Sequence, residues 1–115
     1  MILHQGKSIY YMDFTGLTDE REIKQIIDKS AEFIRSQSPK SVLTLTNLEG
    51  MHFNSTIKEL FSEFISGNKP HIKASAVVGL SGLQRIIYNG VMKITGRDIR
   101  SFDNINVAKD WLIAK

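Results

Sequence analysis

The 115-residue sequence contains no cysteine, which excludes disulfide bonds and thiol catalysis. It has only two prolines and no apolar run near the roughly 18 residues that a membrane-spanning helix needs. A strong charge of either sign is also missing, since 15 basic and 12 acidic residues give a net charge of +3. We therefore expect neither an integral membrane protein nor, from charge alone, a nucleic-acid-binding protein.

The first residues, Met1 to Lys7, form a segment too short and too polar for a secretory signal peptide. The lack of cysteine is compatible with a reducing cytoplasm, so we expect a cytoplasmic protein. No repeat, low-complexity segment or linker divides the chain, and its length suits one core. A single domain over residues 1–115 is the prediction.

Short β-branched or apolar segments alternate with longer segments of helical periodicity along the whole chain. Strands are predicted at 7–14, 41–46, 74–78 and 99–102, with residues 1–4 as a possible hairpin arm. Helices are predicted at about 19–37, after a cap among residues 54–56, after Ser81, and after a cap at 103 or 104. The order β-α-β-α-β-α-β-α indicates an α/β fold with a mainly parallel sheet of about four strands flanked by helices.

The segment from Ala74 to Gln84 combines a buried strand, a glycine turn and the start of a helix. Ser81 and Gln84 have the spacing of a capping box. A helix start of this kind can bind an anion, but a lone Gly-x-x-Gly pattern is much weaker than the dinucleotide fingerprint. We interpret Gly79 and Gly82 as residues that close a tight turn. An apolar stripe of the following helix is predicted at Leu83, Ile87, Val91 and Ile94.

Polar side chains follow the predicted strands at the sheet edge where ligands bind in such folds. The candidates for a partner or ligand site include Asp13, Asn47, His52, Asn54 and Ser81. Ser81, His52 and Asp13 could form a triad on paper, but no nucleophile-elbow motif surrounds Ser81. The three histidines stand in separate segments without the spacing of metal ligands. We predict no catalytic residue, no metal and no cofactor.

The loop after the second long strand contains two large apolar residues, Met51 and Phe53, among polar ones. We expect them to be exposed and to contact a partner. The second half of the chain is basic, but it lacks the interleaved aromatic residues of a nucleic-acid surface. We interpret its cations as an ordinary solvated face.

Six segments together resemble the small bacterial STAS-like, or stage II sporulation protein AA-like, proteins. They are DFTGL at 13–17, SVLTL at 41–45, NKPHIK at 68–73, AVVGLSGL at 76–83, TGR at 95–97 and AKDWL at 108–112. That group is related in fold to anti-sigma-factor antagonists and, more loosely, to CRAL-TRIO lipid-binding domains. The resemblance implies a four-stranded sheet flanked by helices and a protein-interaction role, sometimes switched by phosphorylation or a small ligand.

In the antagonists, the switch is a serine in the motif Asp-Ser-Ser/Thr-Gly at the start of the second helix. The sequence here has Asn54-Ser-Thr-Ile57, so Ser55 and Thr56 match while the acid and the glycine are replaced. The resemblance implies phosphorylation at Ser55 or Thr56, although both residues could simply cap the helix. The overall prediction is a non-enzymatic module that binds a protein. The alternative is a small-molecule or lipid binder with its site at the carboxyl ends of the strands.

Overall fold

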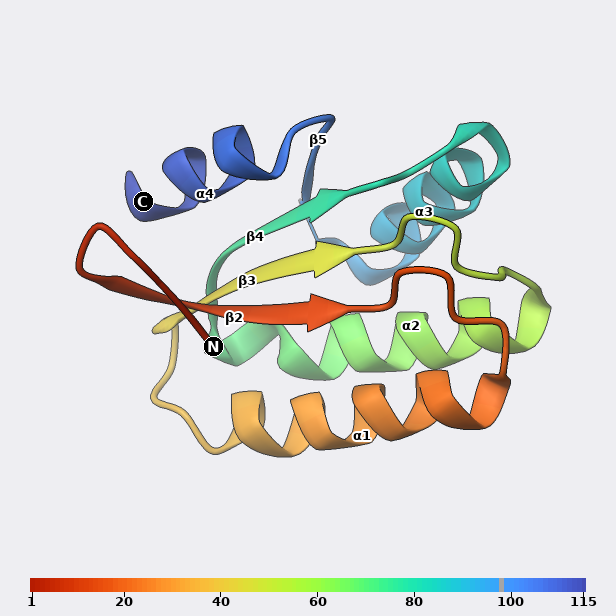
Figure 1. Cartoon of the computed structure of the whole chain (residues 1–115). Helices are drawn as coiled ribbons and strands as arrows, with labels where there is room; N and C mark the ends of the chain where they lie inside the picture. Colours follow the sequence, from red (N-terminus) through yellow and green to blue (C-terminus); the bar gives the residue numbers. More distant parts are fainter. Residues whose placement is uncertain (98) are drawn as a thin grey trace.

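The structure, a computed structural model, describes residues 1–97 and 99–115 as alternating strands and helices (Figure 1). The strands are β1 (Ile2–His4), β2 (Lys7–Asp13), β3 (Val42–Asn47), β4 (Ile72–Val78) and β5 (Arg100–Phe102). The helices are α1 (Glu20–Arg35), α2 (Ser55–Asn68), α3 (Gly82–Thr95) and α4 (Ile105–Ile113), with a 3-10 turn, η1 (Lys69–His71), before β4. The predicted α/β fold is confirmed.

The five strands form one sheet in the order β1-β2-β3-β4-β5, and every pair except β1–β2 is parallel. The short first strand is the predicted hairpin arm. It pairs only with residues 7–9 of β2, whereas residues 10–13 pair with β3 on the other side. Parallel neighbours need crossover connections, which α1, α2 and α3 supply. All carboxyl ends of β2, β3 and β4 therefore lie at one edge of the sheet (Figure 1).

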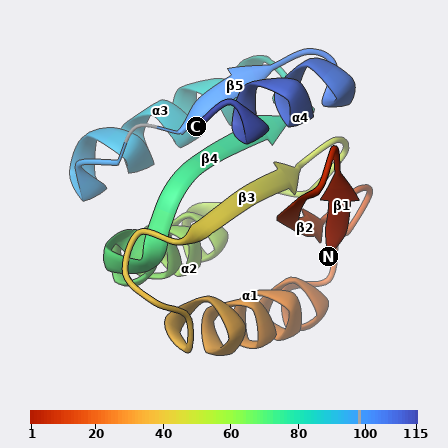
Figure 2. The same ribbon diagram turned by 90° about the vertical axis from the view of Figure 1, so that its left-hand side faces the viewer.

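Two clusters of buried side chains cover the two faces of the sheet. The larger cluster joins α1, α2 and α3 to one face, and Phe61 lies within it against Phe14 at a ring-centroid distance of 5.3 Å. The smaller cluster joins α4 to the other face through Ala108 and Leu112. Figure 2 shows α1 and α2 on one side of the strands and α4 on the other. Because these strands are covered on both faces, residues 42–46 of β3 and residues 75–78 of β4 are buried without a break.

The helices begin and end where polar and proline residues predict. Asp19 caps α1 by accepting a hydrogen bond from the Arg21 amide, and the helix ends at Arg35, two residues earlier than expected. The apolar spacing of the last helix predicts that it buries Val107, Ala108, Trp111 and Leu112, and for Val107, which is 53% exposed, this prediction is wrong. The nine-residue helix buries Ala108 and Leu112 against the sheet, and Ile105, Trp111 and Ile113 pack beside them. The side chains of Leu83 and Ile94, predicted for the stripe of α3, lie outside the described residues.

Candidate functional site

The loops that follow β2, β3 and β4 are joined by main-chain hydrogen bonds at the carboxyl edge of the sheet. The Gly16 amide donates to the Glu49 carbonyl at 2.8 Å, and the His52 amide donates to the Leu17 carbonyl at 2.9 Å. The Leu48 amide donates to the Val78 carbonyl at 3.0 Å. Because these main-chain groups bond to one another, the three loops form one hydrogen-bonded layer across the carboxyl edge of the sheet.

Gly79 lies at the centre of this layer with a positive φ of 82°. A Cβ atom at this position would lie 2.5 Å from the amide nitrogen of Glu49. Glycine is therefore required both by its backbone conformation and by the close approach of the next loop. The interpretation of Gly79 as a tight-turn residue is confirmed, and the main chain of Glu49 fills the space beside it.

Gln84 ties the start of α3 to the same layer. Its side-chain oxygen accepts the Ser81 amide at 3.1 Å, which is the returning bond of the predicted capping box. Its side-chain nitrogen donates to the Met51 carbonyl at 2.6 Å. The residue is only 8% exposed, so both bonds lie in a region where an unpaired amide would be costly.

The prediction that Met51 and Phe53 form an exposed apolar pair is wrong. Met51 is 3% exposed and belongs to the main core, and its amide bonds back to the Leu48 carbonyl at 3.1 Å. Phe53 is half-buried and stacks on Phe61 with ring centroids 6.0 Å apart. The loop folds over the end of the core, and the side chains of Met51 and Phe53 anchor it there.

The N-terminal ends of α1 and α2 lie next to each other at this edge and share a small polar cluster. Asn54 caps α2, because its side-chain oxygen accepts the Ile57 amide at 2.9 Å. The Asn54 amide group also donates to Glu20 of α1 at 2.7 Å and lies 3.3 Å from Nε2 of His52. We call Glu20, His52, Asn54, Ser55 and Thr56 the helix-start surface.

Ser55 and Thr56 are exposed in the first turn of α2. The capping bond of that helix comes from Asn54, and the hydrogen bonds among the described residues include none from either hydroxyl. The interpretation of Ser55 and Thr56 as simple caps therefore does not hold. Both hydroxyls face solvent at the positive end of a helix dipole.

The remaining candidate residues are engaged in separate local bonds. The Asp13 carboxylate accepts the Thr15 amide at 3.0 Å. The Asn47 side chain donates to the Tyr11 hydroxyl at 3.2 Å, and the Ser81 hydroxyl lies 3.2 Å from Oε1 of Gln84. In the described part of the chain, no hydrogen bond joins any two of Asp13, His52 and Ser81, so hydrogen bonding gives the hypothetical triad no support.

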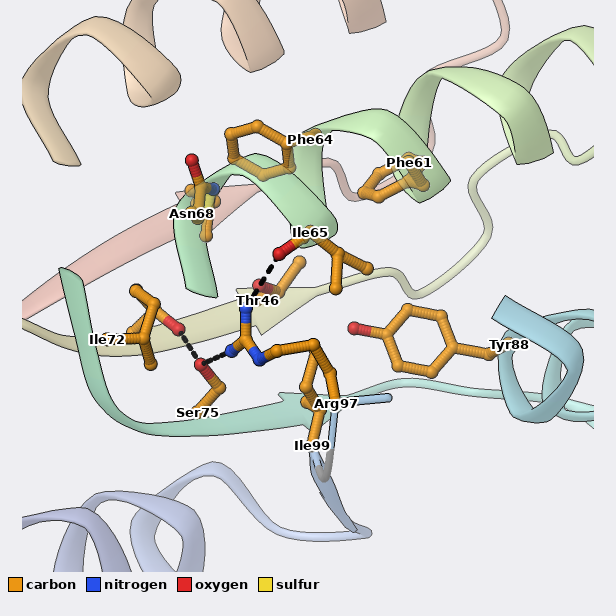
Figure 3. Close-up of a pocket in the computed structure, with 12 residues that line it drawn as sticks. Thr46, Phe61, Phe64, Ile65, Asn68, Ile72, Ser75, Tyr88, Arg97 and Ile99 are labelled. Carbon is orange, nitrogen blue, oxygen red and sulfur yellow. Dashed lines mark hydrogen bonds between the residues drawn. The ribbon is translucent and has the colours of Figure 1, made fainter. Parts of the chain in front are cut away.

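A polar cluster that sequence reasoning missed lies at the other end of α2 (Figure 3). The Arg97 guanidinium donates to the Ile65 carbonyl at 2.9 Å and to Oγ of Ser75 at 2.9 Å. Oγ of Ser75 also accepts the Thr44 hydroxyl at 2.6 Å. The interpretation of the basic second half as a solvated face includes Arg97 and is wrong for this residue. Its position directly after the helix-ending Gly96 is the sequence feature that points to a helix-end contact.

Burial governs the titration of the two ionisable groups in this cluster. It raises the pKa of the Tyr88 phenol above its ordinary value, and the nearby Arg97 cation only partly offsets that effect. Burial likewise lowers the pKa of Arg97. The cavity between them has a volume of about 20 Å³, which is room for about one water molecule.

Hollows large enough for a small molecule lie at the opposite, amino edge of the sheet. One of about 300 Å³ is bordered by Tyr10, Phe33 and Ser41. Another, of about 490 Å³, is bordered by Lys69 and Arg97. Neither matches the predicted ligand site at the carboxyl ends of the strands.

Comparison with protein families matches the chain to the SpoIIAA-like family over residues 9–113. Neither the comparison with curated proteins nor the comparison with solved structures gives a match. In the described part of the chain, no group of three or more His, Asp or Glu residues could hold a metal ion. Within the same part, no helix is both long and apolar enough to cross a membrane.

Proposed function

The chain belongs to the SpoIIAA-like family, and from this premise we propose that it is a STAS-type regulatory module that binds a protein partner at the helix-start surface. The observation that carries the proposal is the exposure of Ser55 and Thr56 beside a cap that Asn54 provides alone. Modification of either hydroxyl would therefore leave the capping bond in place. The surface can change its charge while the fold stays intact.

A phosphate on Ser55 or Thr56 would add about −1.5 to −2 charges. The helix dipole would stabilise that charge by about 0.3–1 kcal/mol at an exposed helix start. Glu20 contributes a negative charge to the same surface and is bonded to Asn54. The added phosphate would repel Glu20 and an acidic partner, so phosphorylation would switch binding off.

The buried position of Met51 removes it from this proposed surface. Met51→Ala would create a cavity in the core and would report on stability instead of binding. Phe53 is half-buried and its stacking on Phe61 also supports the loop. The proposed contact is therefore mainly polar, with His52 and the hydroxyls of Ser55 and Thr56 as its hydrogen-bonding groups.

The test is a pull-down with the parent protein and with Ser55→Asp/Thr56→Asp from cells of its own host. We expect the double variant to keep the thermal midpoint and to lose a partner that the parent recovers. Ser55→Ala/Thr56→Ala should retain the partner. A charge-matched control is Lys109→Gln/Lys115→Gln, which changes the net charge by the same two units on and just after α4, across the sheet.

Recovery of the same partner by Ser55→Asp/Thr56→Asp and by the parent would contradict the proposal. Equal loss with the charge-matched control would also contradict it, since net charge and not the helix-start surface would then govern binding. Intact-mass measurement of protein purified from the host would show directly whether a phosphate is present.

A further inference from the structure

A basic hollow of about 490 Å³ opens at the amino edge of the sheet, on the opposite side from the helix-start surface. Figure 2 faces this edge, where α2 turns into β4 and α3 ends nearby. Four of the side chains that border the hollow are cations, and they come from four places in the chain. They are Lys40 before β3, Lys69 in η1, Lys73 in β4 and Arg97 after α3.

None of the described residues that border this hollow is a carboxylate. Lys40, Lys69 and Lys73 are exposed, so their ammonium groups can reach a ligand. Four like charges around one concave surface repel one another and raise the local positive potential. An anion with more than one negative charge would relieve this repulsion.

The backbone around the hollow is held in place by hydrogen bonds. Lys40 has a positive φ of 52°, a conformation that few residues other than glycine adopt. Its amide donates to the Pro70 carbonyl at 3.0 Å, and the Ser41 amide donates to the His71 carbonyl at 3.1 Å. These bonds fix the loop before β3 against η1, so Lys40 and Lys69 border the same hollow.

Arg97 forms the inner wall of the hollow. Its two bonds, to the Ile65 carbonyl and to Oγ of Ser75, hold the guanidinium between the hollow and the small interior cavity. Lys69 reaches the same place, since a Cβ atom at Gly96 would lie 3.5 Å from its ammonium nitrogen. Arg97 is half-buried, and this burial lowers its pKa because the cation has lost part of its hydration. A bound anion would replace the missing solvation.

We propose that this hollow binds the phosphate groups of an organic phosphate that carries at least two negative charges. Ammonium groups are point charges that bind phosphate oxygens from several directions, and three of them surround this space. None of the described bordering residues is aromatic, so the hollow offers no stacking platform for the bases of a nucleic acid. The phosphate belongs either to a soluble metabolite or to the headgroup of a lipid.

Isothermal titration with inorganic tripolyphosphate tests the soluble form of the ligand. Co-sedimentation with vesicles of phosphatidylcholine, with and without a polyphosphorylated inositol lipid, tests the headgroup form. The test variant is Lys69→Gln/Lys73→Gln, in which both changed side chains are exposed. The matched control is Lys29→Gln/Lys109→Gln, which removes the same charge from α1 and α4.

We expect the parent to bind tripolyphosphate or the inositol-lipid vesicles, and Lys69→Gln/Lys73→Gln to lose at least tenfold in affinity. The control variant should stay within about twofold of the parent, because its charges lie outside the hollow. Binding to the vesicles alone would assign the phosphate to a lipid, and binding to tripolyphosphate would assign it to a soluble molecule. Equal losses in both variants, or binding of neither probe by the parent, would overturn the proposal.

Discussion

The guanidinium of Arg97 donates a 2.9 Å hydrogen bond to the carbonyl oxygen of Ile65, which lies in the last turn of α2. The last four carbonyls of a helix have no partner within the helix, and the negative end of the dipole attracts a cation. Arg35 approaches the same helix end from α1 and donates to the Asn68 side chain at 3.1 Å. Arg35 of α1 and Arg97, which follows α3, therefore both hold the C-terminus of α2.

Replacement of Arg97 by alanine should lower the free energy of unfolding by about 2–4 kcal/mol. The substitution leaves the Ile65 carbonyl and Ser75 without a charged donor, and such bonds contribute about 1.5–3 kcal/mol. Urea unfolding measures the change. Arg21→Ala is the control, because the Arg21 side chain is 91% exposed and its loss should cost less than about 0.5 kcal/mol. Equal unfolding curves for the two variants would contradict the assigned role.

Gly79→Ala should destabilise the protein by about 2–4 kcal/mol, whereas Gly82→Ala should not. At residue 79 the new Cβ would lie 2.5 Å from the Glu49 amide, on a backbone with positive φ. At residue 82 nothing lies within 4 Å of the new atom. The two variants add the same methyl group three residues apart, so their difference in chemical denaturation measures the combined cost of the contact with Glu49 and of the positive φ at residue 79. A neutral Gly79→Ala variant would show that the two loops can separate freely.

Gln84→Ala should cost about 1–3 kcal/mol, because it leaves the buried Met51 carbonyl without its donor. It also removes the bond to the Ser81 amide at the start of α3. The exposed Gln25 of α1 provides a control, since Gln25→Ala removes the same atoms from a solvated helix face. Thermal and urea unfolding of Gln84→Ala and Gln25→Ala measure the two losses of stability. Similar midpoints for the two variants would argue against a buried anchor at residue 84.

Stability should fall as the pH rises above about 10, and Tyr88 should account for part of that fall. Burial raises the pKa of Tyr88 in the folded protein above the ordinary value of 10. At a pH between the pKa of Tyr88 in the unfolded chain and its higher pKa in the folded protein, the unfolded chain releases the phenolic proton and the folded protein keeps it. The free energy of unfolding therefore falls as the pH rises through this range. In Tyr88→Phe the dependence should be shallower, whereas the lysines titrate alike in both proteins. Parallel curves of unfolding free energy from pH 8 to 11 would contradict this.

The regular elements were predictable because their apolar spacing is local. Ile57, Phe61 and Phe64 repeat at helical intervals and all three are buried. The cap of α2 could be narrowed to Asn54, Ser55 or Thr56 but not to one of them, since all three residue types cap helices. The structure selects Asn54 because its side chain also reaches Glu20 on α1.

The features that escaped prediction depend on contacts between distant segments. Met51 stands in a polar loop, and only the fold of that loop over the core buries it. Lys40 and Arg97 are far apart in the sequence and border one hollow because β3, β4 and β5 begin at the same edge. Residue type and spacing do not show which distant residues the fold brings together. In the sequence, cations that border one hollow therefore look like the scattered charges of a solvated face.

The short hairpin strand β1 has a consequence for self-association. The turn between β1 and β2 is held against α4 on both sides, since His4 of β1 bonds to Asp110 at 2.8 Å and Lys7 of β2 donates to the Ile113 carbonyl at 2.7 Å. An edge strand of three residues offers few main-chain groups for pairing with a second sheet. Without β1, the seven-residue β2 would be the edge strand and would present a longer row of unpaired groups. The hairpin covers residues 7–9 of the β2 edge and so shortens the row of main-chain groups with which a second sheet could pair. The residues that hold it in place, His4 and Lys7, precede the range shared with the family.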